Sequence, residues 1–283
     1  MKNVGMICDL SFARHRLFRN YFHAIASLYG TPRIVTTVDG LEKLDILFIG
    51  DDHFYSHKPI LIQPGFVEKC NDDKIEVVLL SSEKMFGTKF PWNEDNYFFI
   101  QKIQKLHHFA YDVDDCKKLN LKLHRLCMSQ YYRSWGEETN KKDKVIFIGS
   151  TKCTHDSYDD RIKMLNQVTK LIEVDIIPPT IPTWEEYMKV LSGYRFVLSP
   201  LGNANALATR FYETLLVRSI PIQQVKEDTL TYYDREADFQ DVIYFKDPQE
   251  IPEKIKDFTL QSSYSELWLE DYLKELLMEI DLL

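Results

Sequence analysis

The stretch YRFVLSPLGNANALATRFYETLLVRSIPIQQV, residues 194–225, decides the fold prediction. It predicts a short buried strand, a loop of small residues, an amphipathic helix from Ala204 to Val217 and a second strand from Ile220 to Val225. The loop contains four turn-forming residues, namely Ser199, Pro200, Gly202 and Asn203. A loop that opens a helix at the carboxyl end of a strand leaves backbone N–H groups free. Together with the helix dipole, these groups favour phosphate.

Two polar side chains on the predicted helix suit such a location. Arg210 and Glu213 are three residues apart, so they share one helix face. On this spacing alone, a solvated ion pair explains them more simply. An arginine can also clamp a diphosphate, however, and a carboxylate can accept hydrogen bonds from ribose hydroxyls. Combined with the preceding loop, the pair predicts a nucleotide-sugar site.

Bulk composition narrows the class of protein. The net charge of −8 argues against a general nucleic-acid partner or an anionic membrane surface. The apolar runs are too short to span a membrane, and the N-terminal residues lack the pattern of a signal peptide. The cysteines are odd in number, five in all, and have no CxxC spacing, so zinc and disulfide frameworks are both poorly supported. We expect a soluble cytoplasmic protein.

The rest of the chain alternates predicted strands with predicted helices, which indicates parallel sheets covered by helices. The predicted strands are Val4–Cys8, Pro32–Val38, Leu44–Ile49, Ile75–Leu80, Lys144–Ile148, Glu173–Ile177, Arg195–Leu198, Ile220–Val225 and Val242–Phe245. Thr183, followed three residues later by Glu186, predicts a helix start with a capping box.

The pattern weakens between residues 90 and 140, where we expect the end of the first domain plus a connector, with a helix from Cys116 to Tyr132. The predicted organisation has three parts. Residues 1–140 form an N-terminal Rossmann-like domain plus the connector, and residues 141–262 form a second Rossmann-like domain. Residues 263–283 form an amphipathic helix that packs back on the first domain. The fold prediction is α/β, with two parallel sheets facing across a cleft and ligands at the carboxyl ends of the strands.

The central stretch resembles the C-terminal half of the exostosin-like glycosyltransferases. That family has a Ser/Cys-Pro-x-Gly loop, then Arg-x-x-Glu on a helix, then Ile-Pro-Ile or Ile-Pro-Val. The matching residues here are Ser199, Pro200, Gly202, Arg210, Glu213, Ile220, Pro221 and Ile222. Where the family has Gly-Cys before Ile-Pro, this chain has Arg218-Ser219.

The resemblance implies the GT-B fold and transfer of a sugar, with xylose the first candidate, from a UDP-sugar to a glycan hydroxyl. It implies that Arg210 binds the diphosphate and that Glu213 binds the ribose or the donor sugar. A weaker resemblance reaches back to residue 144. It adds Ser150 and Thr151 after a strand, and Arg161 on the following helix, to the expected donor-binding residues. For Arg161, a surface pair with Asp159 or Asp160 is an equal alternative.

Polar residues that follow strands of the first domain are the candidates for a general base. Asp52, in the sequence Asp51-Asp52-His53, is the first candidate, Asp9 the second and Glu83 the third. Each could instead be an ordinary polar residue at the end of a strand. The expected reaction is inverting and needs no metal or other cofactor.

One motif supports a different enzyme class. The sequence Asp112-Val113-Asp114-Asp115 imitates the Asp-x-Asp metal motif of the GT-A glycosyltransferases. An acid-rich helix N-terminus explains it more simply, because Lys117 and Lys118 follow directly. A non-catalytic nucleotide- or glycan-binding protein and a nucleotide-sugar epimerase are the remaining alternatives.

Overall fold

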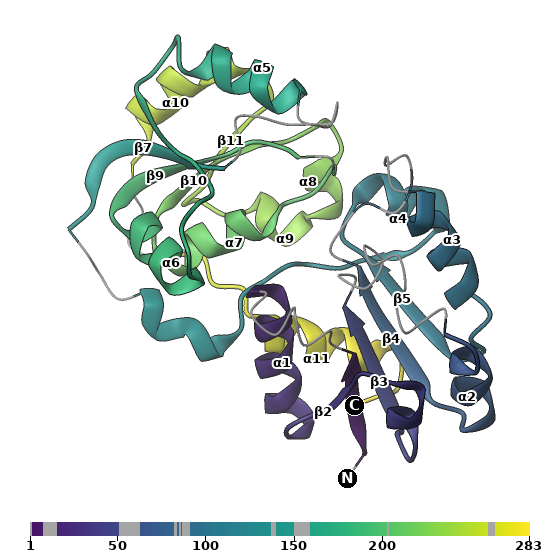
Figure 1. Cartoon of the computed structure of the whole chain (residues 1–283). Helices are drawn as coiled ribbons and strands as arrows, with labels where there is room; N and C mark the ends of the chain where they lie inside the picture. The colour runs from purple at the N-terminus through teal and green to yellow at the C-terminus, as the bar shows by residue number, and fades with distance from the viewer. Residues whose placement is uncertain are drawn as a thin grey trace. The chain divides into compact units, whose positions relative to one another are not determined.

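The computed structural model describes residues 2–7, 16–50, 63–81, 84, 86, 91–136, 140–149, 159–202, 204–259 and 264–283. The chain forms two compact units (Figure 1). The first contains Met1–Tyr131 together with Trp268–Leu283, and the second contains Tyr132–Leu267. The sequence-based divisions follow residues 140 and 262, whereas the units divide after residues 131 and 267.

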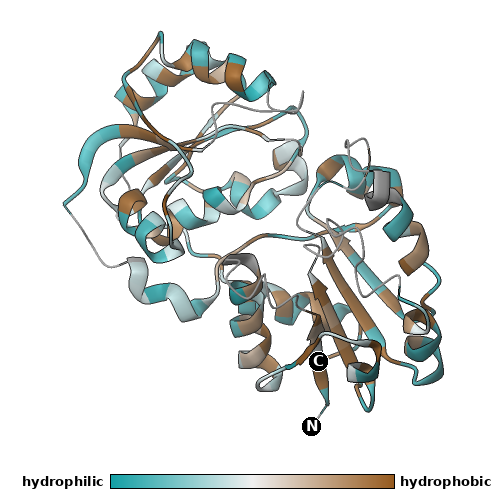
Figure 2. Ribbon diagram, viewed as in Figure 1, coloured by the Kyte–Doolittle hydropathy of each residue, from teal (hydrophilic) through white to brown (hydrophobic). Residues whose placement is uncertain are grey.

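The first unit contains a six-stranded sheet in the order β2-β1-β3-β4-β5-β6, and every described pair of neighbouring strands is parallel. Its strands are β1 (Val4–Ile7), β2 (Arg33–Val35), β3 (Ile46–Gly50), β4 (Glu76–Ser81), β5 (Leu106–Ala110) and β6 (Lys122–Leu123). Strands β1 and β3 are continuous apolar runs and β4 is nearly so, as expected when helices cover both faces of a parallel sheet. Figure 2 shows this hydrophobic character along β3 and β4.

Helices lie on both faces of this sheet. They are α1 (Arg16–Tyr29), η2 (Val38–Leu41), α2 (Phe66–Asp72), α3 (Pro91–Ile100), α4 (Val113–Leu119) and α11 (Leu269–Glu279). Gly30 ends α1 with a φ of 85°, and its N–H donates to the Ala26 carbonyl, as its position after the apolar period predicts. Helix α11 packs beside α1 and buries Leu273 and Leu277 (Figure 1).

The second unit contains a five-stranded parallel sheet in the order β11-β10-β9-β7-β8. Its strands are β7 (Lys142–Ile148), β8 (Val174–Ile177), β9 (Tyr194–Ser199), β10 (Ile220–Gln224) and β11 (Ile243–Phe245). The helices are η5 (Gln130–Gly136), which spans the division between the units, α5 (Asp159–Val168), α6 (Trp184–Ser192), α7 (Thr209–Leu216), α8 (Thr229–Tyr232), α9 (Asp234–Ala237), η7 (Pro248–Glu250) and α10 (Ile251–Asp257).

The two faces of the second sheet carry different helices. Helices α5 and α10 pack on one face, in a core that includes Phe147, Met164 and Ile251 (Figure 1). Helices α6 and α7 cover the other face. Helix α6 begins as predicted, because the Thr183 hydroxyl accepts a hydrogen bond from the Glu186 N–H at 3.2 Å.

The end of α7 contains Arg218 and Ser219, the two residues that depart from the family sequence. Arg218 adopts a φ of 54°, the left-handed conformation that glycine takes without strain. The Ser219 N–H donates to the Thr214 carbonyl at 3.0 Å, which is the closing bond of a Schellman motif. The Ser219 hydroxyl then donates to the Tyr194 carbonyl at 2.7 Å, fixing the start of β10 beside β9.

One prediction for the first unit is wrong. A helix over 116–132 does not form, because α4 ends at Leu119 and the left-handed Asn120 (φ 53°) turns the chain into β6. Strand β5, which the sequence pattern did not predict, pairs in parallel with β4. The two histidines of β5 interrupt the apolar run by which a buried strand is identified in the sequence. His107 pairs with Glu76 at 3.0 Å, and His108 lies 2.9 Å from the Ser81 hydroxyl.

A second prediction, for the central stretch, is partly wrong. The helix expected from Ala204 begins only at Thr209, so the loop after β9 runs through Ala208. Side-chain hydrogen bonds from the buried Asn205 hold these residues outside the helix. None of the described helices is long and apolar enough to cross a membrane.

Buried histidines make the stability of the first unit dependent on pH. Burial lowers the pKa of His108 and of His124 to about 3, and Arg125 adds to the effect on His124. Both folded-state values lie below the usual 6.5, so the unfolded chain binds more protons at acid pH. We expect each histidine to remove up to about 1.4 kcal/mol of unfolding free energy per pH unit as the pH falls below 6.5.

Urea unfolding at a series of pH values between 7.5 and 5 measures this effect. His124→Gln should flatten the dependence, because the neutral side chain takes up no proton in either state. His107→Gln, on the rim of the same sheet, is the matched control. A stability that does not change over this range in the wild-type protein would contradict the expectation.

Candidate functional site

The strand order of the second sheet identifies where a ligand binds. From β7 the chain passes through α5 to β8 on one side, whereas β9 lies on the other side of β7. Such a reversal opens a crevice at the carboxyl ends of the two strands, and ligands of open parallel sheets bind there. Gly149 follows β7, and the loop from Pro200 follows β9. The predicted loop residues Ser199, Pro200 and Gly202 therefore lie at the carboxyl end of β9, beside this switch point.

The loop after β9 is packed rather than loose. Ser199 is 1% exposed, and the Leu201 N–H donates to Gln224 Oε1 at 3.1 Å. The Arg161 side chain lies over Gly202, where a Cβ atom would be only 2.7 Å from a guanidinium nitrogen. Its Nε also donates to the Leu201 carbonyl at 3.4 Å. The structure thus brings Arg161 to the predicted loop, and glycine at position 202 makes this approach possible.

Arg210 is the second residue of α7 and supplies positive charge at the switch point. Its guanidinium lies over the Phe147 ring, 5.1 Å from the centroid. The same group is 3.2 Å from the position that a Cβ atom on Gly149 would occupy. Its Nε is buried without a hydrogen-bond partner, and among the described residues no carboxylate lies within ion-pair distance of the side chain. A partly buried cation without a counter-ion is a binding group for an anion.

The first turn of α7 adds to the positive potential of Arg210. Its N-cap is Ala208, which has no side chain to accept a hydrogen bond, and the first turn contains no acidic residue. The Phe211 N–H donates to the Ala208 carbonyl at 2.9 Å, so the Thr209 and Arg210 N–H groups are the ones that remain for an outside acceptor at the positive end of the dipole. Arg210 and this uncapped turn together form a cationic site suited to a phosphate group.

Glu213 lies one turn further along α7 and, unlike the Arg210 Nε, has a hydrogen-bond partner among the described residues. It is fully buried, and its Oε1 accepts a hydrogen bond from the Trp184 Nε1–H group at 3.0 Å. Trp184 belongs to an aromatic cluster in which its ring lies 4.7 Å from that of Tyr132 and 5.0 Å from that of Trp135. Part of the Glu213 carboxylate is therefore occupied within the protein. Its expected contact with a ribose or sugar stays a prediction.

Several predicted residues lie outside the described part of the chain. They are the base candidates Asp52, Asp9 and Glu83 and the donor-loop residues Asn203, Ser150 and Thr151. The structure describes the strands that precede two of these residues in the chain. Strands β1 and β3 are neighbours, with Ile7 paired to Ile49, and they flank the switch point of the first sheet. Asp9 and Asp52 follow these two strands in the chain.

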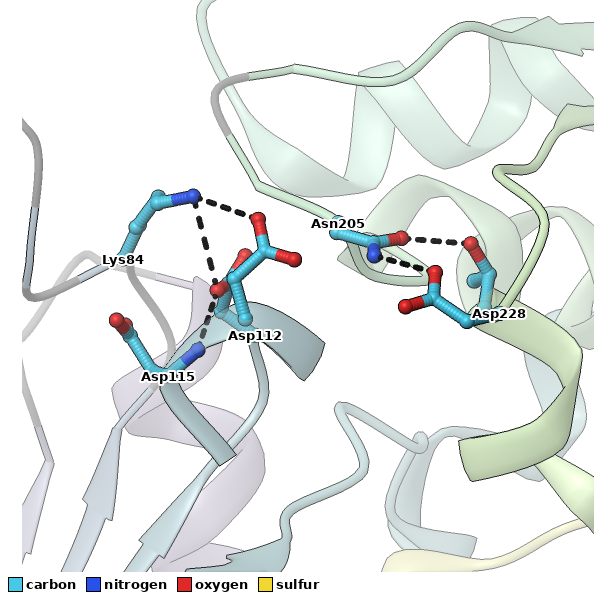
Figure 3. A network of polar contacts seen from close by, with 7 residues as sticks. Lys84, Asp112, Asp115, Asn205 and Asp228 are labelled. Carbon is cyan, nitrogen blue, oxygen red and sulfur yellow. Dashed lines mark hydrogen bonds and ion pairs between the residues drawn. The ribbon is translucent and has the colours of Figure 1, made fainter. Parts of the chain in front are cut away.

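The acidic run 112–115 forms a helix N-terminus, as the simpler interpretation predicts. The Asp112 carboxylate caps α4 by accepting from the Asp115 N–H at 2.9 Å (Figure 3). Lys84 Nζ lies 2.9 Å from Asp114 Oδ2 and 3.9 Å from Asp112 Oδ1. These carboxylates are thus engaged by a cap and by a lysine.

Sequence reasoning missed three residues that shape the site, namely Trp184, Asn205 and Gln224. Their partners are Glu213, Asp228 and Leu201, which are more than twenty positions away in the chain. Sequence patterns over a few neighbouring residues do not indicate pairs so far apart in the chain. The one available signal was the polar Asn205 within a run of alanine and leucine that was read as helix.

No protein-family model and no curated protein matches the sequence. Among solved structures, an α1,3-fucosyltransferase with GDP-fucose superposes with a TM-score of 0.50 and 11% identity, over 99% of this chain and 89% of that chain. The same enzyme with GDP gives 0.49 and 12% identity, over 98% and 89% of the two chains. The UDP-GlcNAc 2-epimerase of Methanocaldococcus jannaschii, in complex with UDP-GlcNAc and UDP, gives 0.42 and 8%, over 95% and 90%.

At these identities the comparison concerns the fold alone. The match to the fucosyltransferase with GDP-fucose, together with the two parallel sheets of six and five strands, confirms the predicted α/β fold of GT-B type. The chain thus has a GT-B fold whose second unit presents a cationic site at the switch point.

The bond between Trp184 and Glu213 is expected to stabilise the second unit. Trp184→Phe keeps an aromatic ring but leaves a buried carboxylate without its donor, so we expect a loss of about 1–3 kcal/mol of unfolding free energy. Trp135→Phe removes an indole from the same cluster without touching this bond and serves as the control. Urea unfolding measures both variants. Equal losses would mean that ring packing, and not the hydrogen bond, stabilises this region.

Proposed function

We propose that the protein is a nucleotide-sugar-dependent glycosyltransferase whose second unit binds the donor. The observation that carries the proposal is the guanidinium of Arg210. It is partly buried and has no counter-ion among the described residues, and it lies at an uncapped helix N-terminus on the switch point of the sheet. A nucleoside diphosphate supplies the anion that this arrangement lacks.

In the proposed complex, Arg210 and the N–H groups at the start of α7 contact the diphosphate. The remaining predicted residues, Ser199, Pro200, Gly202, Asn203, Arg161, Ser150 and Thr151, form the surrounding loops. Glu213 is assigned to the ribose or the sugar, as the resemblance of its motif implies. This charge arrangement stabilises the diphosphate as it leaves, since negative charge grows on it in the transition state.

The finer assignment is a UDP-sugar donor, with xylose as the first candidate sugar and a glycan hydroxyl as acceptor. It rests on the resemblance of residues 199–222 to a family that uses mostly UDP donors. GDP-fucose is the second candidate, because the structure that matches at a TM-score of 0.50 was solved with GDP-fucose.

The proposed reaction inverts the configuration at the donor sugar. A carboxylate takes the proton of the acceptor hydroxyl while the hydroxyl oxygen attacks the anomeric carbon of the donor sugar. The bond from that carbon to the phosphate oxygen breaks, and the nucleoside diphosphate leaves with the electron pair. Asp52, Asp9 and Glu83 are the proposed bases, in that order. No metal ion is required in this scheme, because Arg210 and the helix N-terminus supply the positive charge.

A nucleotide panel tests the donor site. Among UDP, GDP, UDP-xylose, UDP-GlcNAc and GDP-fucose, we expect at least one to raise the melting temperature of the wild-type protein. Arg210→Gln removes the charge and should weaken its Kd about 10- to 100-fold, as measured by calorimetry. Arg195→Gln is the control, since Arg195 pairs with the exposed Asp143 at the opposite end of β9. Unchanged binding by Arg210→Gln, or no binding by the wild type, would contradict the proposal.

Turnover on the best donor tests the base and the metal independence. Released nucleotide is measured with a set of oligosaccharide acceptors, and excess EDTA should leave the rate unchanged. We expect one of Asp52→Asn, Asp9→Asn and Glu83→Gln to lower kcat about 10²- to 10⁴-fold. If all three keep wild-type turnover, the base assignment is wrong. A full metal requirement would favour the GT-A alternative at Asp112–Asp115, and binding without turnover would favour the non-catalytic alternative.

A further inference from the structure

The loop between β9 and α7 is held from one side by the segment that follows β10. Leu201 is bonded to Gln224, the last residue of β10, and Asn205 is bonded to two residues at the start of α8. The loop residues 204–207 are all buried, with exposures of 6% or less. Figure 3 shows the Asn205 contacts with Asp228 and its neighbour. Two separate segments therefore share one polar network.

Asn205 uses both ends of its amide in this network. Its Nδ2 donates to Asp228 Oδ1 at 2.9 Å, and its Oδ1 accepts from the Thr229 hydroxyl at 2.6 Å. The Thr229 oxygen in turn accepts from the Lys226 N–H at 2.9 Å. A carboxylate can only accept, so the Asp228 contact fixes which end of the amide faces it. With Asn205 1% exposed and Thr229 fully buried, water does not replace these bonds.

We propose that Asn205 is a positioning residue that sets the path of the donor loop through Asp228 and Thr229. This inference rests on the proposed function, because the loop it positions is the one assigned to the nucleotide. Asn205 lies three residues after Gly202 and four before the first residue of α7. A fixed Asn205 therefore fixes both the close approach at Gly202 and the direction in which the first N–H groups of α7 point.

The loop needs such an anchor because its own sequence favours another conformation. Residues 204–208, Ala-Asn-Ala-Leu-Ala, have good helix propensity and could extend α7 toward Gly202. An extended helix would pair the N–H groups of the present first turn and so withdraw them from a ligand at the switch point. The bonds of Asn205 oppose this extension, since a side chain bound to Asp228 and Thr229 keeps residue 205 out of the helix.

A charge-exchange pair of variants tests the assignment. Asn205→Asp places a second carboxylate against Asp228 and removes the donor, so the contact becomes repulsive. The double variant Asn205→Asp/Asp228→Asn restores one donor and one carboxylate with their positions exchanged, and Thr229 can still donate to residue 205. Two exposed positions of the same unit give matched controls, namely Asn166→Asp and Asp238→Asn.

Two measurements are made on each variant. Amide hydrogen exchange of residues 201–209 reports on the loop without any nucleotide, and calorimetry with the nucleotide that the wild type binds reports on the site. We expect Asn205→Asp to speed exchange in this loop and to weaken Kd about tenfold or more, while exchange in β7 and β10 is unchanged. The double variant should return both values to within about threefold of wild type, which a general loss of stability would not do.

The outcomes separate this inference from the proposed function. Absence of nucleotide binding by the wild type defeats the proposed function and this inference with it. Wild-type binding with no effect of Asn205→Asp, or with no rescue in the double variant, overturns the positioning role alone. Should Asn205→Asp fail to fold, Thr229→Val, which removes the hydroxyl, is compared with Thr229→Ser, which keeps it. Equal affinity of these two would then overturn the inference.

Discussion

The guanidinium of Arg210 carries a charge that no described carboxylate neutralises, and the surrounding residues are arranged to keep it so. The Phe147 ring supports one face of the guanidinium, and the absence of a side chain at Gly149 leaves room for it. Desolvating a cation costs free energy, and an aromatic face returns only part of that cost. The fold holds this group in place through α7, whose end is fixed by Arg218 and Ser219 against the sheet.

The two polar residues of one motif have opposite environments, and this difference defines the site. Glu213 is buried and accepts a hydrogen bond from Trp184 inside the unit, whereas the Arg210 Nε is buried without a hydrogen-bond partner among the described residues. A carboxylate that paired with the arginine would cancel the field that an anion requires. By binding its acid to an indole N–H, the protein keeps the pair apart. The aromatic cluster around Trp184 thus contributes to the electrostatics of the site as well as to the core.

The sequence was most informative where local rules decide the structure. The apolar runs predicted nine of the eleven described strands at nearly correct positions, with Ser199-Pro200 marking the end of β9 and Thr183 the start of α6. Strand β5 was missed because His107 and His108 find partners on β4, a neighbour only in three dimensions. The start of α7 was misplaced for the same reason, since Asn205 is held by residues 23 and 24 positions later. Arg210 was identifiable from its motif, but its lack of a counter-ion was not.

The last helix gives the chain an unusual order of assembly. Helix α11 belongs to the first unit, where Glu270 accepts hydrogen bonds from the Ser129 hydroxyl and the Gln130 N–H, and Leu273 and Leu277 are fully buried. A ribosome makes these residues after the whole second unit. The first unit therefore keeps an uncovered apolar surface beside α1 until α11 has been made. A nascent chain that stops after the second unit would present a complete second unit and an incomplete first unit, whose apolar surface chaperones bind.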